Sequence, residues 1–400
     1  MKISILGSAV TQFGELWDQS LVELMNQAMT DSLEDAATNS SITVSQIEAV
    51  FVANKAAGSF ENQHHLNALA SQFFDHLPPA MRVEAACASG GLALLAAEHA
   101  LLAGQYKTVM VVGVEKMTDV SGSETTRILS GAADATQEYG STFPALYGLL
   151  TQLHSQKFGT TRQQLSQVAV KNHLHALSNP HAQFHKGLTV EQVSKSTLVA
   201  EPIRLLDCSP ISDGAAAVIL TTQEFAGKDL TQITGFGHGQ DHMELAHRKD
   251  LTTFAATQKA AQQAFTAANL KPSDISAAEV HDCFTIGEIL AIEDLGFFAK
   301  GEGGKATEVG LTTADTSAQK TANKSTNLPV NLRPKNGLII NPSGGLKGCG
   351  HPVGATGVKQ LAYLHKYLQQ NNFRYGLTHN VGGAGATAVV HILENQKGAK

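Results

Sequence analysis

Two segments that lie far apart in the chain follow one pattern, and this repetition limits the possible folds more than any other feature of the sequence. Residues 44–54 read VSQIEAVFVAN, and residues 272–282 read PSDISAAEVHD. In both, a short polar link leads into an apolar run typical of a buried strand. Each is preceded by an expected strand and an expected helix, at 3–10 and 21–37 in the first half and at 233–237 and 254–268 in the second. Two copies of one α/β unit, packed as one body, are therefore predicted.

Composition narrows the class of protein. The chain has 400 residues and a formal net charge of −6 at pH 7, which is long enough for two such units and gives no basic footprint for nucleic acid. Four cysteines in this length make no disulfide framework, and no CxxC pair indicates structural zinc. No segment reaches the roughly 20 apolar residues that span a bilayer, and neither terminus carries a recognisable targeting signal. We expect a cytoplasmic protein that binds no nucleic acid and does not insert into membranes.

The stretch 83–103, VEAACASGGLALLAAEHALLA, places a thiol at a bend. Small residues follow Cys87, and a run of strong helix formers follows them. The unpaired amides and positive end of that helix would stabilise a thiolate, the reactive form of cysteine. Cys87 is therefore either a nucleophile at neutral pH, if a base is near, or a buried structural cysteine.

Three further bends carry histidine, cysteine or an unusual number of glycines. They are His281-Asp282-Cys283-Phe284, the segment NPSGGLKGCGHPVGATG at 341–357, and HNVGGAGAT at 379–387. All fall at expected ends of strands, where open α/β sheets place their sites.

Together the four bends resemble the thiolase family. CASGG at Cys87, HDCF at His281, GHPVGATG at Gly350 and NVGG at Asn380 occur in the order expected of thiolases, and SPISDGAAA at Ser209 is also similar. The segment KFGTTRQQLSQVAVKNH is similar to the sterol-carrier-protein type of thiolase.

This resemblance implies an α/β fold, namely the duplicated, five-layered αβαβα fold with an inserted loop domain. The implied N-terminal half covers residues 1–118 and 208–230, and the implied C-terminal half covers residues 231–400. Residues 119–207 would be the inserted loop domain, which helps to hold coenzyme A. The resemblance also implies a homodimer or a dimer of dimers.

The resemblance further implies an acyl-CoA C-acyltransferase. Such an enzyme cleaves 3-ketoacyl-CoA with coenzyme A, or runs the reverse Claisen condensation, through an acyl-cysteine. Cys87 would be the nucleophile and His351 its base, since histidine titrates near neutral pH. His281 and His351 would bind the enolate oxygen, and the N–H groups of Cys87 and Gly382 would form the second oxyanion hole. Acyl-CoA and coenzyme A are then substrates, and no metal or other cofactor is expected.

This chain differs from the commoner thiolases in the position of one acid/base cysteine. Those place an acid/base cysteine in a CxGGG motif near the C-terminus, where this chain has Asn380, which we expect at the substrate site. In the sterol-carrier-protein type the cysteine of HDCF serves instead, so Cys283 is the expected second acid/base. Cys349 could compete but is expected to be a packed neighbour, and Cys208 to be buried and inert. Asp282 either orients a histidine or, as we expect, caps the helix that follows it.

Other polar residues receive simpler interpretations. His173, His175, His181 and His185 are expected on a solvated loop, because no carboxylate or cysteine is interleaved at ligand spacing. The same is expected of His238, His242 and His247. The segment GFGHG at 235–239 lacks the GxGxxG spacing and is expected to be a turn, and residues 301–328 are expected to be a surface loop.

Two other functions stay open at this point. A condensing synthase of the ketoacyl or hydroxymethylglutaryl type also uses a cysteine with histidines, but lacks the second acid/base cysteine. A non-catalytic lipid- or acyl-CoA-binding protein is the other class, and the joint presence of two motif cysteines and two motif histidines argues against it.

Overall fold

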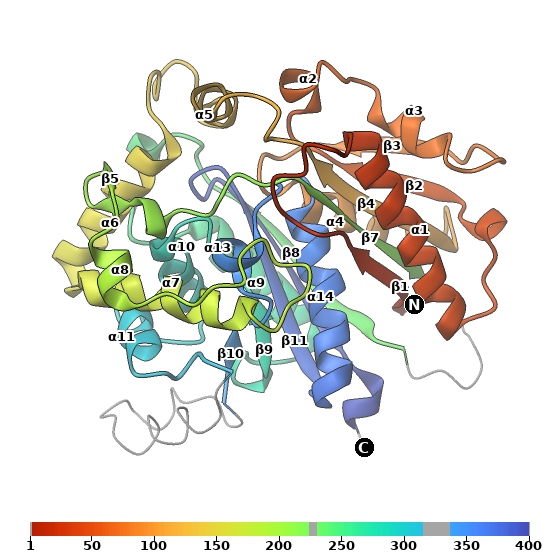
Figure 1. Ribbon diagram of the computed structural model, residues 1–400. Coiled ribbons are helices and arrows are strands. Elements are labelled where there is room, and N and C mark those ends of the chain that lie inside the picture. The colour runs from red at the N-terminus through yellow and green to blue at the C-terminus, as the bar shows by residue number, and fades with distance from the viewer. Residues whose placement is uncertain (1, 224–229, 315–336, 400) are drawn as a thin grey trace.

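A single mixed sheet of ten strands runs through the protein (Figure 1). The computed structural model describes residues 2–223, 230–314 and 337–399. The strands lie in the order β10-β9-β11-β12-β8-β1-β7-β4-β2-β3. Their bounds are β1 (Ile3–Val10), β2 (Ala49–Ala53), β3 (Ala80–Val83), β4 (Thr108–Glu115), β7 (Gly214–Thr221), β8 (Gln232–Gln240), β9 (Ala277–Glu279), β10 (Ile339–Ile340), β11 (Tyr375–Gly382) and β12 (Thr387–Glu394).

The strand order confirms the predicted duplication. Read outward from the contact between β1 and β8, the first half runs β1-β7-β4-β2-β3 and the second runs β8-β12-β11-β9-β10. In each half the inner two pairings are antiparallel and the outer two are parallel. The repeated segments of the sequence form β2 and β9, which hold the same place in the two halves. Ile3 pairs with Ile233 where the halves join.

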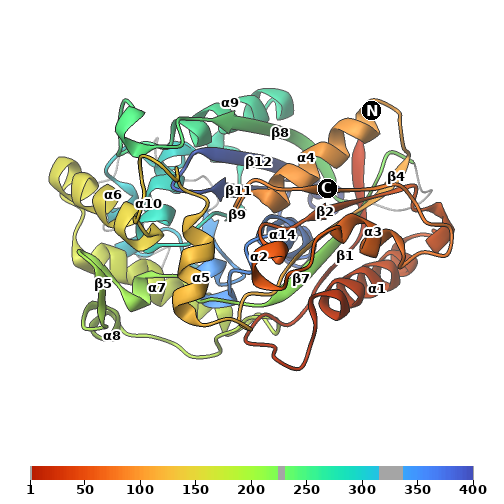
Figure 2. The same ribbon diagram turned by 90° about the horizontal axis from the view of Figure 1, so that it is seen from above.

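Helices cover the sheet in layers (Figure 2). On one outer face α1 (Leu21–Asn39) packs against the first half, and on the other α9 (Ala255–Ala268) and α10 (Thr285–Asp294) pack against the second. Between the halves lie α4 (Ser89–Leu102) and α14 (Thr356–Asn371), whose apolar residues share one buried cluster with strands of both halves. The layers therefore follow the expected αβαβα order.

The two central helices touch at glycines. A Cβ atom at Gly90 would lie 2.6 Å from the backbone nitrogen of Gly357, which is too close for any side chain. Glycine therefore allows the first turn of α4 to rest directly on the first turn of α14. Because Cys87 precedes α4 and His351 precedes α14, this contact brings the two sequence motifs together.

The segment GFGHG extends the strand expected at 233–237 and does not form the expected turn. It forms the middle of β8, where a Cβ atom at Gly235 would lie 2.3 Å from the carbonyl oxygen of Ala264 in α9. Alternating glycines leave one face of this strand without side chains, so α9 packs directly against the strand backbone. This close packing explains the spacing of the glycines.

Residues 119–207, between β4 and β7, form mostly helical structure at one end of the sheet, beside α10 (Figure 1). The elements are α5 (Gly122–Ser130), α6 (Phe143–Phe158), α7 (Arg162–Ala176), α8 (Val190–Ser194), β5 (Leu198–Ala200) and β6 (Ile203–Arg204). Apolar residues of α6 and α7 share a buried cluster with α10. The division of the chain into a loop domain and two halves stays a prediction.

Two expected loops are partly helical and buried. His173 and His175 lie on α7, where their Nδ1 atoms hydrogen-bond the carbonyls of Lys186 and Asn341 at 3.0 Å each. Within the expected loop 301–328, α11 (Gly303–Glu308) is largely buried, and residues 315–328 lie outside the described residues. In both segments, contacts with distant parts of the chain bury residues whose local sequence is polar. No described helix combines the length and the apolar character that crossing a membrane requires.

Candidate active site

Cys87 lies on a tight turn at the start of α4, as predicted. Ala86 adopts a left-handed backbone conformation with φ of 51°, which only a strongly held turn imposes on a residue with a side chain. The Ser89 hydroxyl holds this turn, donating to the carbonyl of Ala86 at 2.6 Å and accepting from the N–H of Ala85 at 2.9 Å. The turn leaves the Cys87 thiol facing a cavity at the end of the central helix.

Two hydrogen bonds hold His351 on the loop between α13 (Gly345–Cys349) and α14. Its backbone N–H donates to the Ser212 hydroxyl at 2.9 Å, and its Nδ1 lies 2.7 Å from the Thr356 hydroxyl. That hydroxyl donates its own hydrogen to the carbonyl of Pro352 at 3.0 Å, so it must accept from His351. Nδ1 therefore carries the hydrogen, and Nε2, which has no hydrogen-bond partner among the described residues, presents a lone pair.

His281 and His351 both lie beside Cys87. The two ring centroids lie 5.2 Å apart with ring planes at 83°. The Cys87 sulfur and one ring nitrogen of each histidine all lie within 4.8 Å of one another. Three distant motifs of the sequence thus converge at one point.

Cys283 lines the same cavity as Cys87 and His351. Burial and the neighbouring Cys87 raise the pKa of the Cys283 thiol well above its usual value. Its thiol is therefore protonated at neutral pH and can donate a proton. Because Cys87 and Cys283 line one cavity, the structure is compatible with the expected joint action of the two thiols.

The cavity has a volume of about 170 Å³ and a mainly apolar wall. The apolar side chains come from widely separated parts of the chain and include Met117, Leu129, Phe143, Ile211, Phe284 and Val353. Such a wall excludes water and suits an acyl chain.

At Cys87, the effect of burial on the pKa of the thiol outweighs the effect of the nearby amides. Burial raises the pKa of the thiol to about 11, although the charge of Lys55 and the amides of Gly383 and Cys87 itself act to lower it. Burial thus favours the neutral thiol over the thiolate that the helix terminus alone would favour. A nucleophilic role for Cys87 therefore needs a nearby base that removes the proton. Burial, followed by the charge of Lys359, lowers the pKa of His351 to about 3, so its Nε2 is free to accept.

Asp282 does not cap the helix that follows it. Its carboxylate instead accepts from the backbone N–H groups of Leu346 at 2.6 Å and Lys347 at 3.2 Å, and from the Asn172 amide at 2.6 Å. The short turn between Asp282 and α10 points the carboxylate back towards α13. Asp282 thereby ties the HDCF motif to the loop that carries His351.

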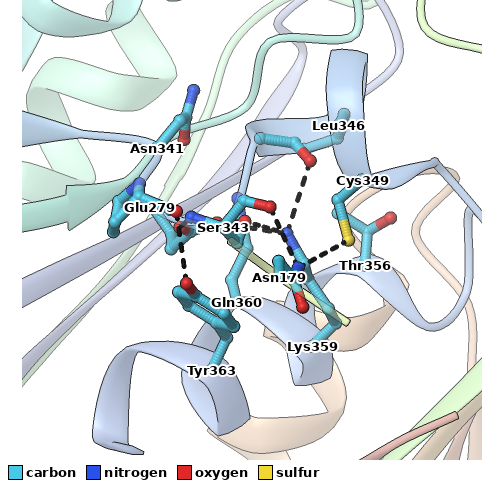
Figure 3. A network of polar contacts seen from close by, with 12 residues as sticks. Asn179, Glu279, Asn341, Ser343, Leu346, Cys349, Thr356, Lys359, Gln360 and Tyr363 are labelled. Atoms are coloured by element: carbon cyan, nitrogen blue, oxygen red, sulfur yellow. Dashed lines mark hydrogen bonds and ion pairs between the residues drawn. The ribbon is translucent and has the colours of Figure 1, made fainter. Parts of the chain in front are cut away.

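A buried ionic network supports that loop from behind (Figure 3). Lys359 of α14 lies 3.2 Å from the Glu279 carboxylate, and both side chains are almost fully buried. Lys359 also donates to the Ser343 hydroxyl, which itself donates to Glu279 at 2.6 Å. Asn179 donates to the Cys349 sulfur at 3.4 Å. Cys349 is therefore the packed neighbour that was expected.

Some expected residues differ in detail from their predicted places. The amide that contacts the Cys87 sulfur belongs to Gly383, one residue after Gly382, and the oxyanion role of Gly382 stays a prediction. Cys208 is half-buried and lines the cavity, and burial raises the pKa of its thiol to about 12, so it is a weak nucleophile. The Asn380 side chain contacts Cys87 and His281, and direct binding of substrate by Asn380 stays a prediction.

Sequence reasoning missed Tyr147, which lies on α6 and is 1% exposed. Its ring stacks on Phe284 at 4.4 Å, and its hydroxyl donates to the carbonyl of Gly383 at 3.3 Å and hydrogen-bonds the Cys283 thiol. Thr142 followed by Pro144 is a helix-start signal that could have located α6. Tyr147 therefore links the HDCF motif to Gly383, whose amide contacts the Cys87 sulfur.

One group of exposed residues has a metal-like arrangement. Ligand atoms of His242, Glu244 and His247 lie within 4.8 Å of one another. His242 and His247 are solvent-exposed, as expected for this loop, and exposed groups of this kind commonly lie close together without a bound ion.

Comparison with known proteins agrees with this geometry. Residues 3–224 match the thiolase N-terminal domain family, and residues 237–395 match the thiolase C-terminal-domain-like family. An acetyl-CoA acetyltransferase from Methanothermobacter thermautotrophicus is 44% identical, across 98% of this chain and 99% of the relative. Sterol carrier protein 2 from Bos taurus is 29% identical, across 78% of this chain and 58% of its own length. The solved Ltp2-ChsH2(DUF35) aldolase aligns with 99% of this chain and 98% of its own at a TM-score of 0.75 and 21% identity, which shows a shared fold.

Proposed function

The chain belongs to the thiolase family, and from that premise we propose that it is an acetyl-CoA acetyltransferase. It joins two acetyl-CoA molecules, or cleaves a 3-ketoacyl-CoA with coenzyme A, through an acyl group on Cys87. The observation that carries this proposal is the convergence of the Cys87 sulfur with one nitrogen each of His281 and His351 within 4.8 Å. The name of the 44% identical relative supports the acetyl specificity.

The cleavage direction begins at Cys87. Its sulfur attacks the C3 carbonyl of the 3-ketoacyl-CoA, while Nε2 of His351 takes the thiol proton. The bond between C2 and C3 then breaks, and its electron pair moves to the acetyl-CoA part as an enolate. The Cys283 thiol gives its proton to C2, which releases acetyl-CoA and leaves acyl-Cys87 beside a Cys283 thiolate.

The second half of the cycle restores both sulfurs. The Cys283 thiolate takes the proton of incoming coenzyme A, whose sulfur attacks the acyl-Cys87 carbonyl. Cys87 leaves as a thiolate and recovers its proton from His351. The reverse sequence is the Claisen condensation, and coenzyme A enters only as a substrate.

Mass spectrometry of the intact protein tests the proposal. Mixing with acetyl-CoA should add one acetyl group to Cys87, and Cys87→Ala should abolish both the adduct and thiolysis. Cys208→Ala is the matched control, because Cys208 lines the same cavity and should keep both. Thiolysis that survives Cys87→Ala would exclude the proposal.

A condensing synthase is the alternative, and Cys283→Ala distinguishes it. In an acetyltransferase, Cys283→Ala should still form acetyl-Cys87 but lose thiolysis by about 10²-fold or more, the usual contribution of an acid/base group. Condensation unaffected by this change would favour the synthase.

We also propose a cytoplasmic homodimer. The four cysteines, all among the described residues, are free thiols, which suits a reducing compartment. The edge strand β3 has a neighbour on one side in the sheet and carries Met81 at 48% exposure. A partner's β3 would cover this edge. Light scattering should give twice the monomer mass, and Met81→Asp should give monomers.

A further inference from the structure

The side-chain amide of Asn380 has one possible orientation. Its Oδ1 accepts the backbone N–H of Gly91 at 3.0 Å, and its Nδ2 donates to the backbone carbonyl of Cys87 at 3.0 Å. Exchanging the two amide atoms would place a donor against a donor and an acceptor against an acceptor. Asn380 is 2% exposed, so water offers no replacement partners.

This orientation determines where His281 carries its hydrogen. Nδ2 of Asn380 also lies 3.3 Å from Nδ1 of His281. Because Nδ2 has hydrogens and no lone pair, Nδ1 of His281 must be the acceptor. Burial, together with the neighbouring His351 and His379, lowers the pKa of His281 well below its usual value, so the ring is neutral. Its one hydrogen therefore resides on Nε2.

The geometry points to Asn380 as a positioning residue that holds His281 in the Nε2–H tautomer, so that His281 donates a hydrogen bond to the substrate oxygen. His351 has the opposite tautomer, because Thr356 accepts from its Nδ1. Two adjacent imidazoles thus differ at Nε2, which carries the hydrogen in His281 and a lone pair in His351, and neither Nε2 has a hydrogen-bond partner among the described residues. Nε2–H of His281 stabilises negative charge on oxygen, and the Nε2 lone pair of His351 receives the Cys87 proton. The catalytic consequence rests on the proposed function, whereas the tautomer itself does not.

The same assignment explains why the convergent donor atoms are a poor metal site. Three of them lie within 4.8 Å, but a cation needs a lone pair from each. In His281 the Nε2 atom carries the hydrogen and the Nδ1 lone pair faces Asn380, so neither nitrogen has a lone pair free for a cation. A carboxylate at residue 380 would reverse this, because it accepts from Nδ1 and frees the Nε2 lone pair.

Nitrogen NMR of the wild-type protein tests the tautomer directly. Among the 17 histidines, His281→Gln assigns the signals of His281. The expected result is a protonated Nε2 and an unprotonated Nδ1 for His281. The reverse pattern would overturn the inference even if the protein proved to be an acetyltransferase, and this measurement needs no activity.

Asn380→Asp is the sharper variant because it has nearly the same shape. We expect Asn380→Asp to move the His281 hydrogen to Nδ1 and to lower kcat by about 10²–10³-fold, the usual cost of losing one oxyanion donor. Asn380→Ala, which imposes neither tautomer, should lose less. An Asp variant as active as the wild type, or more active than the Ala variant, contradicts the inference.

Zinc provides a readout that a merely structural role would not change. After incubation with Zn²⁺ and dialysis, Asn380→Asp should retain about one equivalent of zinc on Cys87, His281 and His351. The wild type should retain about one equivalent less, since both proteins share the exposed group of His242, Glu244 and His247. Equal zinc retention by both proteins would mean that Nε2 of His281 already has a free lone pair, and the inference would be wrong.

Discussion

Gly90→Ala tests whether the contact between the two central helices sets both stability and catalysis. The added Cβ would lie 2.6 Å from the nitrogen and 2.7 Å from the Cα of Gly357, and 2.8 Å from the nitrogen of Val358. Ordinary contact begins at 3.4 Å, so the helices must separate by about 0.8 Å. All three neighbours are backbone atoms, which cannot rotate away. We therefore expect the free energy of unfolding to fall by about 3 kcal/mol, the upper end of the usual cost of overpacking.

The same displacement should also lower kcat. Cys87 immediately precedes α4, and Thr356, which holds His351, is the first residue of α14. Moving the helices apart therefore moves Cys87, the proposed nucleophile, away from His351, its proposed base. A shift of about 1 Å in a catalytic group costs roughly 10²-fold in rate. We expect kcat to fall by about that factor in Gly90→Ala while the protein stays folded.

Urea unfolding and steady-state thiolysis would measure the two effects in parallel. Gly122→Ala is the matched control, because a Cβ there has no atom within 4 Å, and it should change neither stability nor kcat. Gly91→Ala is a milder member of the series, with its nearest contact at 3.0 Å to a side-chain atom of Val389. It should fall between the other two. Two results for Gly90→Ala, taken together, would refute this reasoning. The first is a free energy of unfolding within about 1 kcal/mol of the wild type, which is below the usual cost of overpacking. The second is an unchanged kcat.

Three further predictions concern the buried charges. Alkylation of Cys87 by iodoacetamide should rise about tenfold per pH unit and approach a plateau only near pH 11, because the thiolate reacts and its pKa is about 11; a plateau near neutral pH would contradict the assignment. Lys55→Met should raise that pKa further and slow alkylation at any one pH, since the charge of Lys55 lowers it, whereas Lys55→Arg should not. Lys359→Met should lower the free energy of unfolding by about 3–5 kcal/mol, because it leaves the Glu279 carboxylate buried without its cation. Adding Glu279→Gln should recover part of that loss in urea unfolding, and no recovery would show that the two charges act independently.

The sequence predicts what is local to each bend. The thiol at the start of a helix, the HDCF motif and the histidine after the GCG turn each depend on a few adjacent residues. The internal repeat then predicts that these bends share one edge of a duplicated sheet. The resemblance of these motifs to those of thiolases, in the same order along the chain, then singles out Cys87, His281, Cys283 and His351.

What the sequence does not predict depends on contacts across long separations. Tyr147 reaches the site from α6, a helix without a catalytic motif. The pKa of Cys87 depends on how completely other elements cover it, which a helix-start pattern does not report. The orientation of Asn380 depends on Gly91, 289 positions earlier in the chain. The local sequence of the β8 glycines is typical of a turn, and only their packing against α9 explains their place in a strand.

The symmetry of the sheet also has a consequence for the independence of its two repeats. The first repeat supplies Cys87, the proposed nucleophile, and the second supplies His281, His351 and Cys283. Neither unit retains a complete reaction of its own, so the duplication can no longer be undone without losing the activity. An enzyme built in this way is bound to its doubled length.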